Sequence, residues 1–252
     1  MLAKYDVAYL YCESCGYLRT EEPHWLAEAY SQAILDADTG ILQRNLRLAR
    51  ILSGLCYYLG RDKRYVDVGG GYGVLTRLMR DYGFDFWWSD PHAENLFARL
   101  FVADRGAASW GAVTFFEVLE HIVDPVAWLT ETLDAFPTDT LVFTTETFAG
   151  EPPAPGTWWY YVPEGGQHVS FFQPRTLTAL AERFGLRYLA AGASVHVMSK
   201  KDLSPTLLKF LAGRGSHLVG PVIKRTMKSL TEADHAAALD ELKLAQTGRK
   251  SD

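Results

Sequence analysis

The chain has 252 residues, of which 48% are hydrophobic and 13% aromatic, and its net charge is −5. This is enough apolar material for the core of one α/β domain with additions, and the acidic balance gives no reason to expect nucleic acid as a partner. No apolar run reaches transmembrane length, no signal-peptide pattern opens the chain, and three cysteines make no disulfide framework, so we expect a cytoplasmic protein.

A cysteine pair near the start raises the question of a metal. Cys12 and Cys15 flank two residues and resemble half of a zinc knuckle. A structural zinc ion usually takes four ligands, and only Cys56 and His24 are available to complete the set. No βαβ pattern surrounds the pair, which disfavours a thioredoxin-like redox role. We therefore expect no bound zinc and no metal site.

Strand-like and helix-like segments alternate through the middle of the chain, after two expected helices over residues 24–59. Such alternation predicts βαβ units and a parallel sheet with helices on both faces. The poverty of β signals between residues 101 and 111 prevents us from placing a strand there. The expected strands are 65–68, 84–88, 112–116, 140–146, 186–191 and 193–199, and the expected helices are 74–82, 92–100, 124–135, 174–184 and 231–246.

The strand at 65–68 runs directly into three glycines at spacing two, Gly69, Gly71 and Gly73. Glycines at a strand-to-helix turn permit positive φ and let a ligand approach bare backbone N–H groups at a helix N-terminus. Asp90 ends the next strand about twenty residues later, where a carboxylate can accept hydrogen bonds from ribose hydroxyls. The dinucleotide fingerprint G-x-G-x-x-G/A fails in both registers, which disfavours a nicotinamide enzyme.

A second motif follows the 112–116 strand. It reads Glu117-Val-Leu-Glu120-His121 and leads to Asp124-Pro125. Together with Asp67-x-Gly-x-Gly-x-Gly, Asp90 and a later His168-Val-Ser-Phe-Phe, it resembles the motifs of class I S-adenosylmethionine-dependent methyltransferases. The resemblance covers about residues 65–200 and is closest to the large subgroup that acts on small molecules and sugars.

The resemblance implies a fold and a division of the chain. We expect a mostly parallel seven-stranded sheet with helices on both faces, ending in two antiparallel strands. Residues 1–60 would form an N-terminal segment and helical cap, in which Tyr30 touches the ligand. Residues 61–200 would form the cofactor-binding core, and residues 201–252 a C-terminal helical extension.

The resemblance also implies the residues that hold S-adenosylmethionine, and each has a plainer alternative. Asp67 would otherwise cap a turn, Asp90 would cap a helix, and Glu117 would be a solvated acid on the rim. The expected cofactor-binding residues are Asp67, Gly69, Gly71, Gly73, Asp90, Pro91 and Glu117.

Methyl transfer from a sulfonium needs a positioned nucleophile, exclusion of water and, for a hydroxyl, removal of a proton. His168 is the first candidate for the base and His121 the second, because histidine titrates near working pH; the alternative is that His168 only orders its loop. The aromatic run Trp158, Trp159, Tyr160, Tyr161 suits a sugar or aromatic acceptor or a sulfonium, or it simply packs the loop.

We therefore expect methylation of a small molecule or glycan, most plausibly on oxygen, with carbon and nitrogen open. The alternative is a non-catalytic S-adenosylmethionine-binding partner subunit. The sequence does not fix the oligomeric state. Residues 203–230 carry five basic side chains and no acid, and we expect them to dock Leu207, Leu208, Leu211 and Leu218 on the domain or on a partner. Attraction of this stretch to a phosphorylated or membrane-linked substrate stays open.

Overall fold

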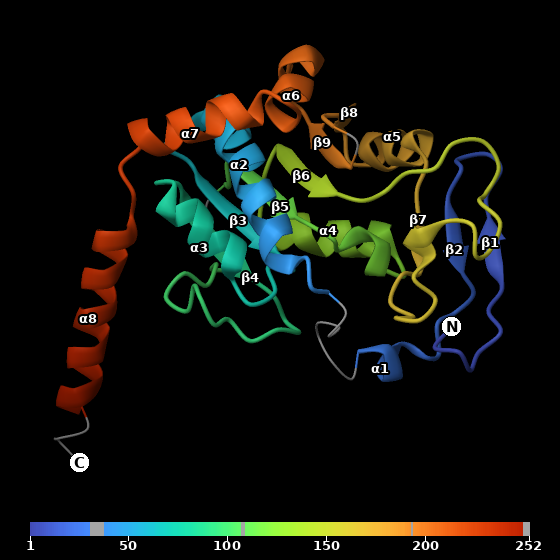
Figure 1. Ribbon diagram of the computed structural model, residues 1–252, viewed down its shortest axis with the longest axis horizontal. Coiled ribbons are helices and arrows are strands. Elements are labelled where there is room, and N and C mark those ends of the chain that lie inside the picture. Colours follow the sequence, from blue (N-terminus) through green and yellow to red (C-terminus); the bar gives the residue numbers. More distant parts are fainter. Residues whose placement is uncertain (31–37, 107–108, 193, 249–252) are drawn as a thin grey trace.

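The computed structural model describes residues 1–30, 38–106, 109–192 and 194–248, and its centre is a six-stranded sheet (Figure 1). The strand order is β4-β3-β5-β6-β9-β8; the first four strands are parallel, and β9 is antiparallel to both of its neighbours. The strands are β3 (Arg64–Val68), β4 (Asp85–Ser89), β5 (Ala112–Phe115), β6 (Thr140–Thr144), β8 (Arg187–Ala190) and β9 (Val195–Ser199).

The expected mostly parallel α/β fold is confirmed, but the expected count of seven strands is wrong. Beside β4, the described chain makes only an isolated parallel bridge between Val102 and Trp88. The chain then turns at Gly106, where φ is +78°, so this segment does not extend into a strand.

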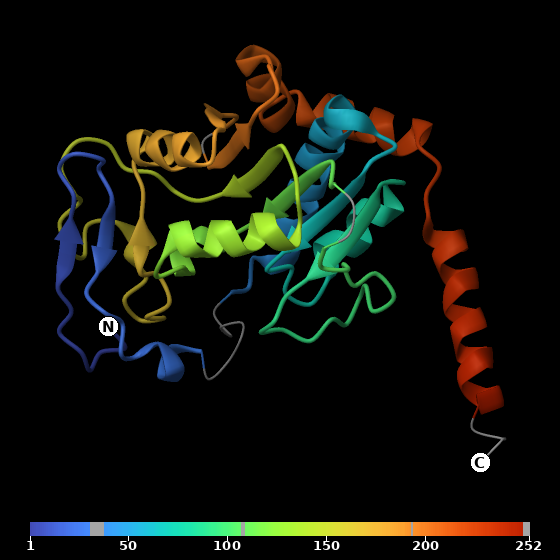
Figure 2. The same ribbon diagram turned by 180° about the vertical axis from the view of Figure 1, so that it is seen from behind.

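Helices cover both faces of the sheet, as Figures 1 and 2 show from opposite sides. One apolar cluster joins the sheet to α2 (Ile41–Gly60), α3 (Val74–Asp81), α6 (Pro205–Ala212) and α7 (Ser216–Thr226). The other joins the opposite face to α4 (Pro125–Ala135) and α5 (Pro174–Arg183). The residues of β3, β5 and β6 are accordingly almost all buried, as expected for a parallel sheet that is covered on both faces.

The helix expected over residues 92–100 does not form. Two of its backbone N–H groups, those of Leu96 and Phe97, donate to the Tyr72 carbonyl in the glycine loop instead of to carbonyls within a helix. The Asn95 side chain accepts from the Ala98 N–H and donates to the Ala98 carbonyl, which completes a tight turn. The segment therefore braces the glycine loop instead of covering the sheet.

A second, three-stranded antiparallel sheet lies at one end of the molecule (Figure 1). It pairs β1 (Tyr9–Tyr11) and β2 (Leu18–Thr20) with β7 (Ser170–Phe171), which is about 150 residues away in the chain. The short helix α1 (Leu26–Ala29) follows it. This sheet fixes the segment that carries His168, two residues before β7.

The C-terminal region is partly docked and partly projecting. Leu208 and Leu211 are buried against α2, as expected, whereas Leu218 is 69% exposed and does not dock on the domain, which leaves docking on a partner as the untested alternative for that residue. The last helix, α8 (Thr231–Gly248), is anchored at its first turn by the buried pair of Arg80 and Asp234 and then extends away from the body (Figures 1 and 2). Within the described ranges, none of the helices is both long and apolar enough to span a lipid bilayer.

Candidate active site

The glycine loop has the backbone geometry that its sequence predicts. Gly69, Gly71 and Gly73 have φ values of +70°, +52° and +83°. A methyl group added to Gly69 would come within 2.6 Å of Val118, whereas one added to Gly71 would meet no described atom within 4 Å. The loop therefore packs against the Glu117–His121 motif on one side and faces open space at Gly71, where a ligand can approach.

Asp90 ends β4 and joins two turns. One carboxylate oxygen accepts from the Gly71 N–H at 2.9 Å, and the other accepts from the N–H groups of His92 and Ala93 at 2.7 and 3.1 Å. Pro91 next to it is exposed. The carboxylate is half-buried beside the glycine loop, a position that suits contact with hydroxyls of a bound nucleoside.

Asp67 lies below the loop rather than in it. Its side chain is 3% exposed and accepts from the Thr114 hydroxyl at 2.9 Å. Burial, with a smaller contribution from the Asp90 charge, raises the pKa of Asp67 to about 7. Asp67 therefore supports the loop from inside the sheet.

Glu117 lies two residues after β5 in a strained backbone conformation. Its φ is +54°, a value that residues other than glycine rarely adopt. The Thr144 hydroxyl donates to its carboxylate at 2.6 Å, and its own N–H donates back to that hydroxyl at 2.9 Å. The two bonds hold the half-buried carboxylate between the glycine loop and the next turn.

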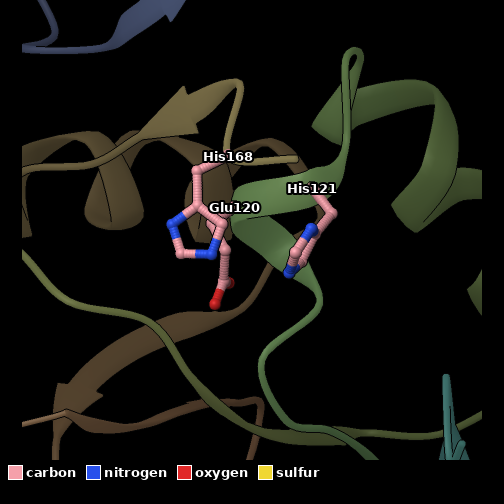
Figure 3. A group of neighbouring side chains, drawn as sticks. All are labelled: Glu120, His121 and His168. Atoms are coloured by element: carbon pink, nitrogen blue, oxygen red, sulfur yellow. The ribbon is translucent and has the colours of Figure 1, made fainter. Parts of the chain in front are cut away.

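The 3-10 turn η1 (Leu119–His121) brings together three side chains from two distant segments: Glu120, His121 and His168 (Figure 3). One nitrogen or oxygen atom of each lies within 4.8 Å of the others. The two imidazole rings are 4.8 Å apart and nearly perpendicular. Tyr30 reaches the group from the N-terminal region, with its hydroxyl 3.0 Å from His121 Nδ1.

Burial dominates the electrostatics of this cluster. It raises the pKa of Glu120 to about 8, with a further increase from the charge of Glu117, and the neighbouring Tyr160 opposes the shift. It lowers the pKa of His121 to about 3, an effect that the His168 charge adds to and the Gln167 backbone opposes. Burial also lowers the pKa of His168. Burial therefore shifts all three groups toward their neutral forms.

The structure separates the four aromatic residues of the loop. The 3-10 turn η2 (Trp159–Tyr161) places Tyr160 against His168, with ring centroids 4.7 Å apart, and leaves Trp159 71% exposed. Tyr160 also packs with Trp158, Tyr161 and Phe171 in one cluster against the small sheet. Three of the four therefore stabilise the loop, Tyr160 among them, and Trp159 is exposed.

The cysteine pair lies in the turn between β1 and β2, and both side chains are half-buried free thiols. Hydrogen bonding to Ser14 is the main cause that lowers the pKa of Cys12 to about 7.

The sequence analysis named both histidines as candidate bases but gave Glu120 no role beyond its place in the motif. Glu120 has 0% exposure, which makes it the most unusual member of the cluster. The Glu120-His121 pair shortly after an expected strand was the part of the sequence that could have indicated Glu120 as a site residue. Its burial depends on the small sheet and Tyr160, which the sequence pattern did not predict.

Comparisons with known proteins agree with this geometry. The model of a family described as a methyltransferase domain matches residues 41–191, more than half of the chain. No curated protein matches the chain in sequence.

The chain is similar to several proteins of known structure. A 1,6-didemethyltoxoflavin-N1-methyltransferase from Burkholderia thailandensis, with bound 1,6-didemethyltoxoflavin and S-adenosylhomocysteine, is 17% identical with a TM-score of 0.52, over 77% of this chain and 97% of that one. TnmH is 16% identical with a TM-score of 0.47, over 71% of this chain and 62% of its own length. A magnesium protoporphyrin IX methyltransferase from Synechocystis is 11% identical with a TM-score of 0.44, over 70% and 94%.

The glycine loop, the acid after β4 and the family match over the whole parallel part of the sheet lead to one conclusion. The chain belongs to the methyltransferase domain family and is an S-adenosylmethionine-dependent methyltransferase of the class I fold.

Proposed function

We propose that this enzyme methylates a hydroxyl oxygen of a small molecule or glycan. The observation that carries the proposal is the Glu120–His121–His168 cluster beside the glycine loop. In such a reaction the acceptor oxygen attacks the methyl carbon, the carbon–sulfur bond breaks, and its electron pair stays on sulfur as S-adenosylhomocysteine leaves. The hydroxyl proton must go to another group, and an amine with a free lone pair has less need of one at that step.

The cofactor is proposed to lie over Gly69, Gly71 and Gly73, with its ribose on Asp90 and with Pro91 at the rim. Glu117 would contact the side of the cofactor nearest the histidines, and Asp67 would stabilise the loop from below. Open space above Gly71 and the half-buried carboxylate of Asp90 support this arrangement. Within the chain, we propose that residues 1–60 cap the site, 61–200 carry it and 201–252 extend the core.

The acceptor is proposed to bind between the cofactor methyl and the segment from Trp158 to His168. Trp159 is the aromatic side chain of this loop that is exposed and remains for it, since the other three pack against the small sheet. His168 is the first group proposed to receive the proton, and His121 is the second. Neither has a carboxylate partner at hydrogen-bond distance among the described residues, so neither is held as a charged imidazolium.

Nitrogen is the second candidate for the methylated atom, because the similar enzyme from Burkholderia thailandensis is an N1-methyltransferase. The two can be separated with S-adenosylmethionine labelled with carbon-13 in its methyl group and a library of hydroxyl and amine acceptors. The chemical shift of the product methyl distinguishes oxygen, nitrogen and carbon. We expect an O-methyl signal, and a signal only from N-methyl or C-methyl products would overturn the proposal.

A further inference from the structure

The carboxylate of Glu120 is the least compensated polar group in the site. The side chain has 0% exposure, and both of its oxygens lack a hydrogen-bond partner among the described residues. The Tyr160 hydroxyl is near enough to lower the pKa of Glu120, but its hydrogen bond within 3.5 Å is with the Thr145 hydroxyl, at 3.2 Å. A buried carboxyl group without a partner costs free energy, so its presence in a well-packed turn indicates a ligand that supplies the missing contacts.

The imidazoles of the two histidines lie next to the Glu120 carboxylate (Figure 3), with one nitrogen of each within 4.8 Å of the other and of a carboxylate oxygen. His168 Nδ1 lies 2.6 Å from the Tyr160 carbonyl, which can only accept, so the proton is on Nδ1 and the lone pair is on Nε2. The Tyr30 hydroxyl can accept likewise from Nδ1 of His121, 3.0 Å away. An imidazole that donates one N–H to a fixed oxygen and offers the other nitrogen has the usual orientation of a metal ligand.

The surrounding charge also favours a cation. The carboxylate of Glu117 is close enough to raise the pKa of both Glu120 and Glu146. Arg44 donates two hydrogen bonds to Asp38, which is the main cause that raises the pKa of its guanidinium, and the nearby Glu117 and Glu120 add to that increase. Arg47 lies near Glu146, so among the described residues the acids Glu117, Glu146 and Asp38 stand against the bases Arg44 and Arg47, which leaves an excess of one negative charge without counting Glu120.

We propose that Glu120, His121 and His168 bind one divalent first-row transition-metal cation, such as Zn²⁺ or Mn²⁺. Two imidazoles and one carboxylate leave a coordination position open for a substrate oxygen, as in catalytic metal sites. Ligands of a tetrahedral zinc ion at about 2.0–2.1 Å are roughly 3.4 Å apart. Donors within 4.8 Å of one another thus reach a common ion through small side-chain movements. The expectation of no metal considered only the cysteine pair.

This inference deepens the proposed function and rests on it for its role in the reaction. The acceptor hydroxyl would bind at the open coordination position of the cation, which would lower the pKa of that hydroxyl. Its proton would then leave to solvent as the oxygen attacks the methyl group. His168 would then be a metal ligand and not the base. The two roles exclude each other, because both use the Nε2 lone pair.

The test is calorimetric titration of the chelator-treated full chain with ZnCl₂ and with MnCl₂. We expect one site per chain, at least a hundredfold weaker binding in Glu120→Gln and in His168→Gln, and weaker binding of Mg²⁺, which prefers oxygen ligands. The matched control is the double variant Cys12→Ser/Cys15→Ser, which should bind as the wild type does. Circular dichroism confirms that each variant folds.

X-ray absorption of the zinc-loaded protein gives a readout independent of activity, and we expect nitrogen and oxygen ligands without sulfur. Absence of binding, binding unchanged in Glu120→Gln, or a sulfur ligand lost with the cysteines would each overturn the inference. If O-methylation persists in chelator while no metal binds, the proposed function stands and the metal site falls. If the metal binds but the methyl goes to nitrogen, the metal site stands and the proposed acceptor falls.

Discussion

The glycine loop and the Glu120–His121–His168 cluster lie side by side, but they are built in different ways. The loop is formed by a few consecutive residues whose conformation is set by glycines, and its main partner, Asp90, ends the adjacent strand. The cluster joins a turn after β5 to a segment almost fifty residues later, and Tyr30 reaches it from the opposite end of the chain. A local motif can hold a cofactor shared by many enzymes, whereas a non-local cluster can vary the chemistry without disturbing it.

The largest expected effect tests the cluster alone. We expect His168→Gln to reduce turnover on the identified acceptor by about two to four orders of magnitude, whether His168 is a base or a metal ligand. Cofactor affinity should stay unchanged, because His168 does not contact the glycine loop. Steady-state kinetics at saturating cofactor, together with titration of S-adenosylhomocysteine, measure the two quantities. Near-normal turnover would leave His168 with only a role in ordering the loop.

Asp90→Ala tests the loop alone. It removes the acceptor of three backbone N–H groups and the proposed ribose contact, so we expect cofactor affinity to fall by about ten- to a hundredfold. Turnover at saturating cofactor should change much less. Calorimetry with S-adenosylhomocysteine measures the affinity, and an unchanged dissociation constant would reject the assignment of Asp90.

A smaller effect is expected from Gly71→Ala. The new side chain strains a residue at φ +52° by about 1–2 kcal/mol and enters the space proposed for the cofactor. Gly156→Ala is the matched control, because Gly156 has φ +79° and equally open surroundings but lies in the loop between β6 and η2. Both variants should lose similar stability in thermal unfolding. Only Gly71→Ala should lose cofactor affinity, and equal losses of affinity would contradict the comparison.

The smallest expected effect is on the pH dependence of stability, through Asp67, which lies buried below the glycine loop. Asp67 has a pKa of about 7 in the folded chain against an ordinary value of 3.8. Between these values the folded chain retains a proton that the unfolded chain has lost, so this group makes stability decrease as pH rises from about 4 to 7. Asp67→Asn should flatten that decrease in urea unfolding of the cofactor-free protein. A variant with the slope of the wild type would show that Asp67 does not titrate in this range.

The same contrast explains how much the sequence could predict. The glycine spacing predicted positive φ at Gly69, Gly71 and Gly73, and apolar runs predicted the parallel strands, because both depend on neighbouring residues. The helix expected at 92–100 failed because Asn95 and Tyr72 hold that backbone through contacts outside the local pattern.

The candidate site was predictable only in part for the same reason. His121 and His168 were named from their motifs, but the burial of Glu120 was not. That burial requires β7, a strand of two residues, to pair with β2 near the N-terminus. Strands this short carry no readable period, so the sheet that positions His168 has no signature in the sequence.

A double-mutant cycle in cofactor affinity tests most directly whether the two regions have separate tasks. S-adenosylhomocysteine is titrated into the wild type, Asp90→Ala, His168→Gln and the double variant. We predict that Asp90→Ala weakens binding, that His168→Gln does not, and that the double variant matches Asp90→Ala, with a coupling energy near zero. If His168→Gln weakened cofactor binding as strongly as Asp90→Ala, the cluster would be part of the cofactor site and the account would be wrong.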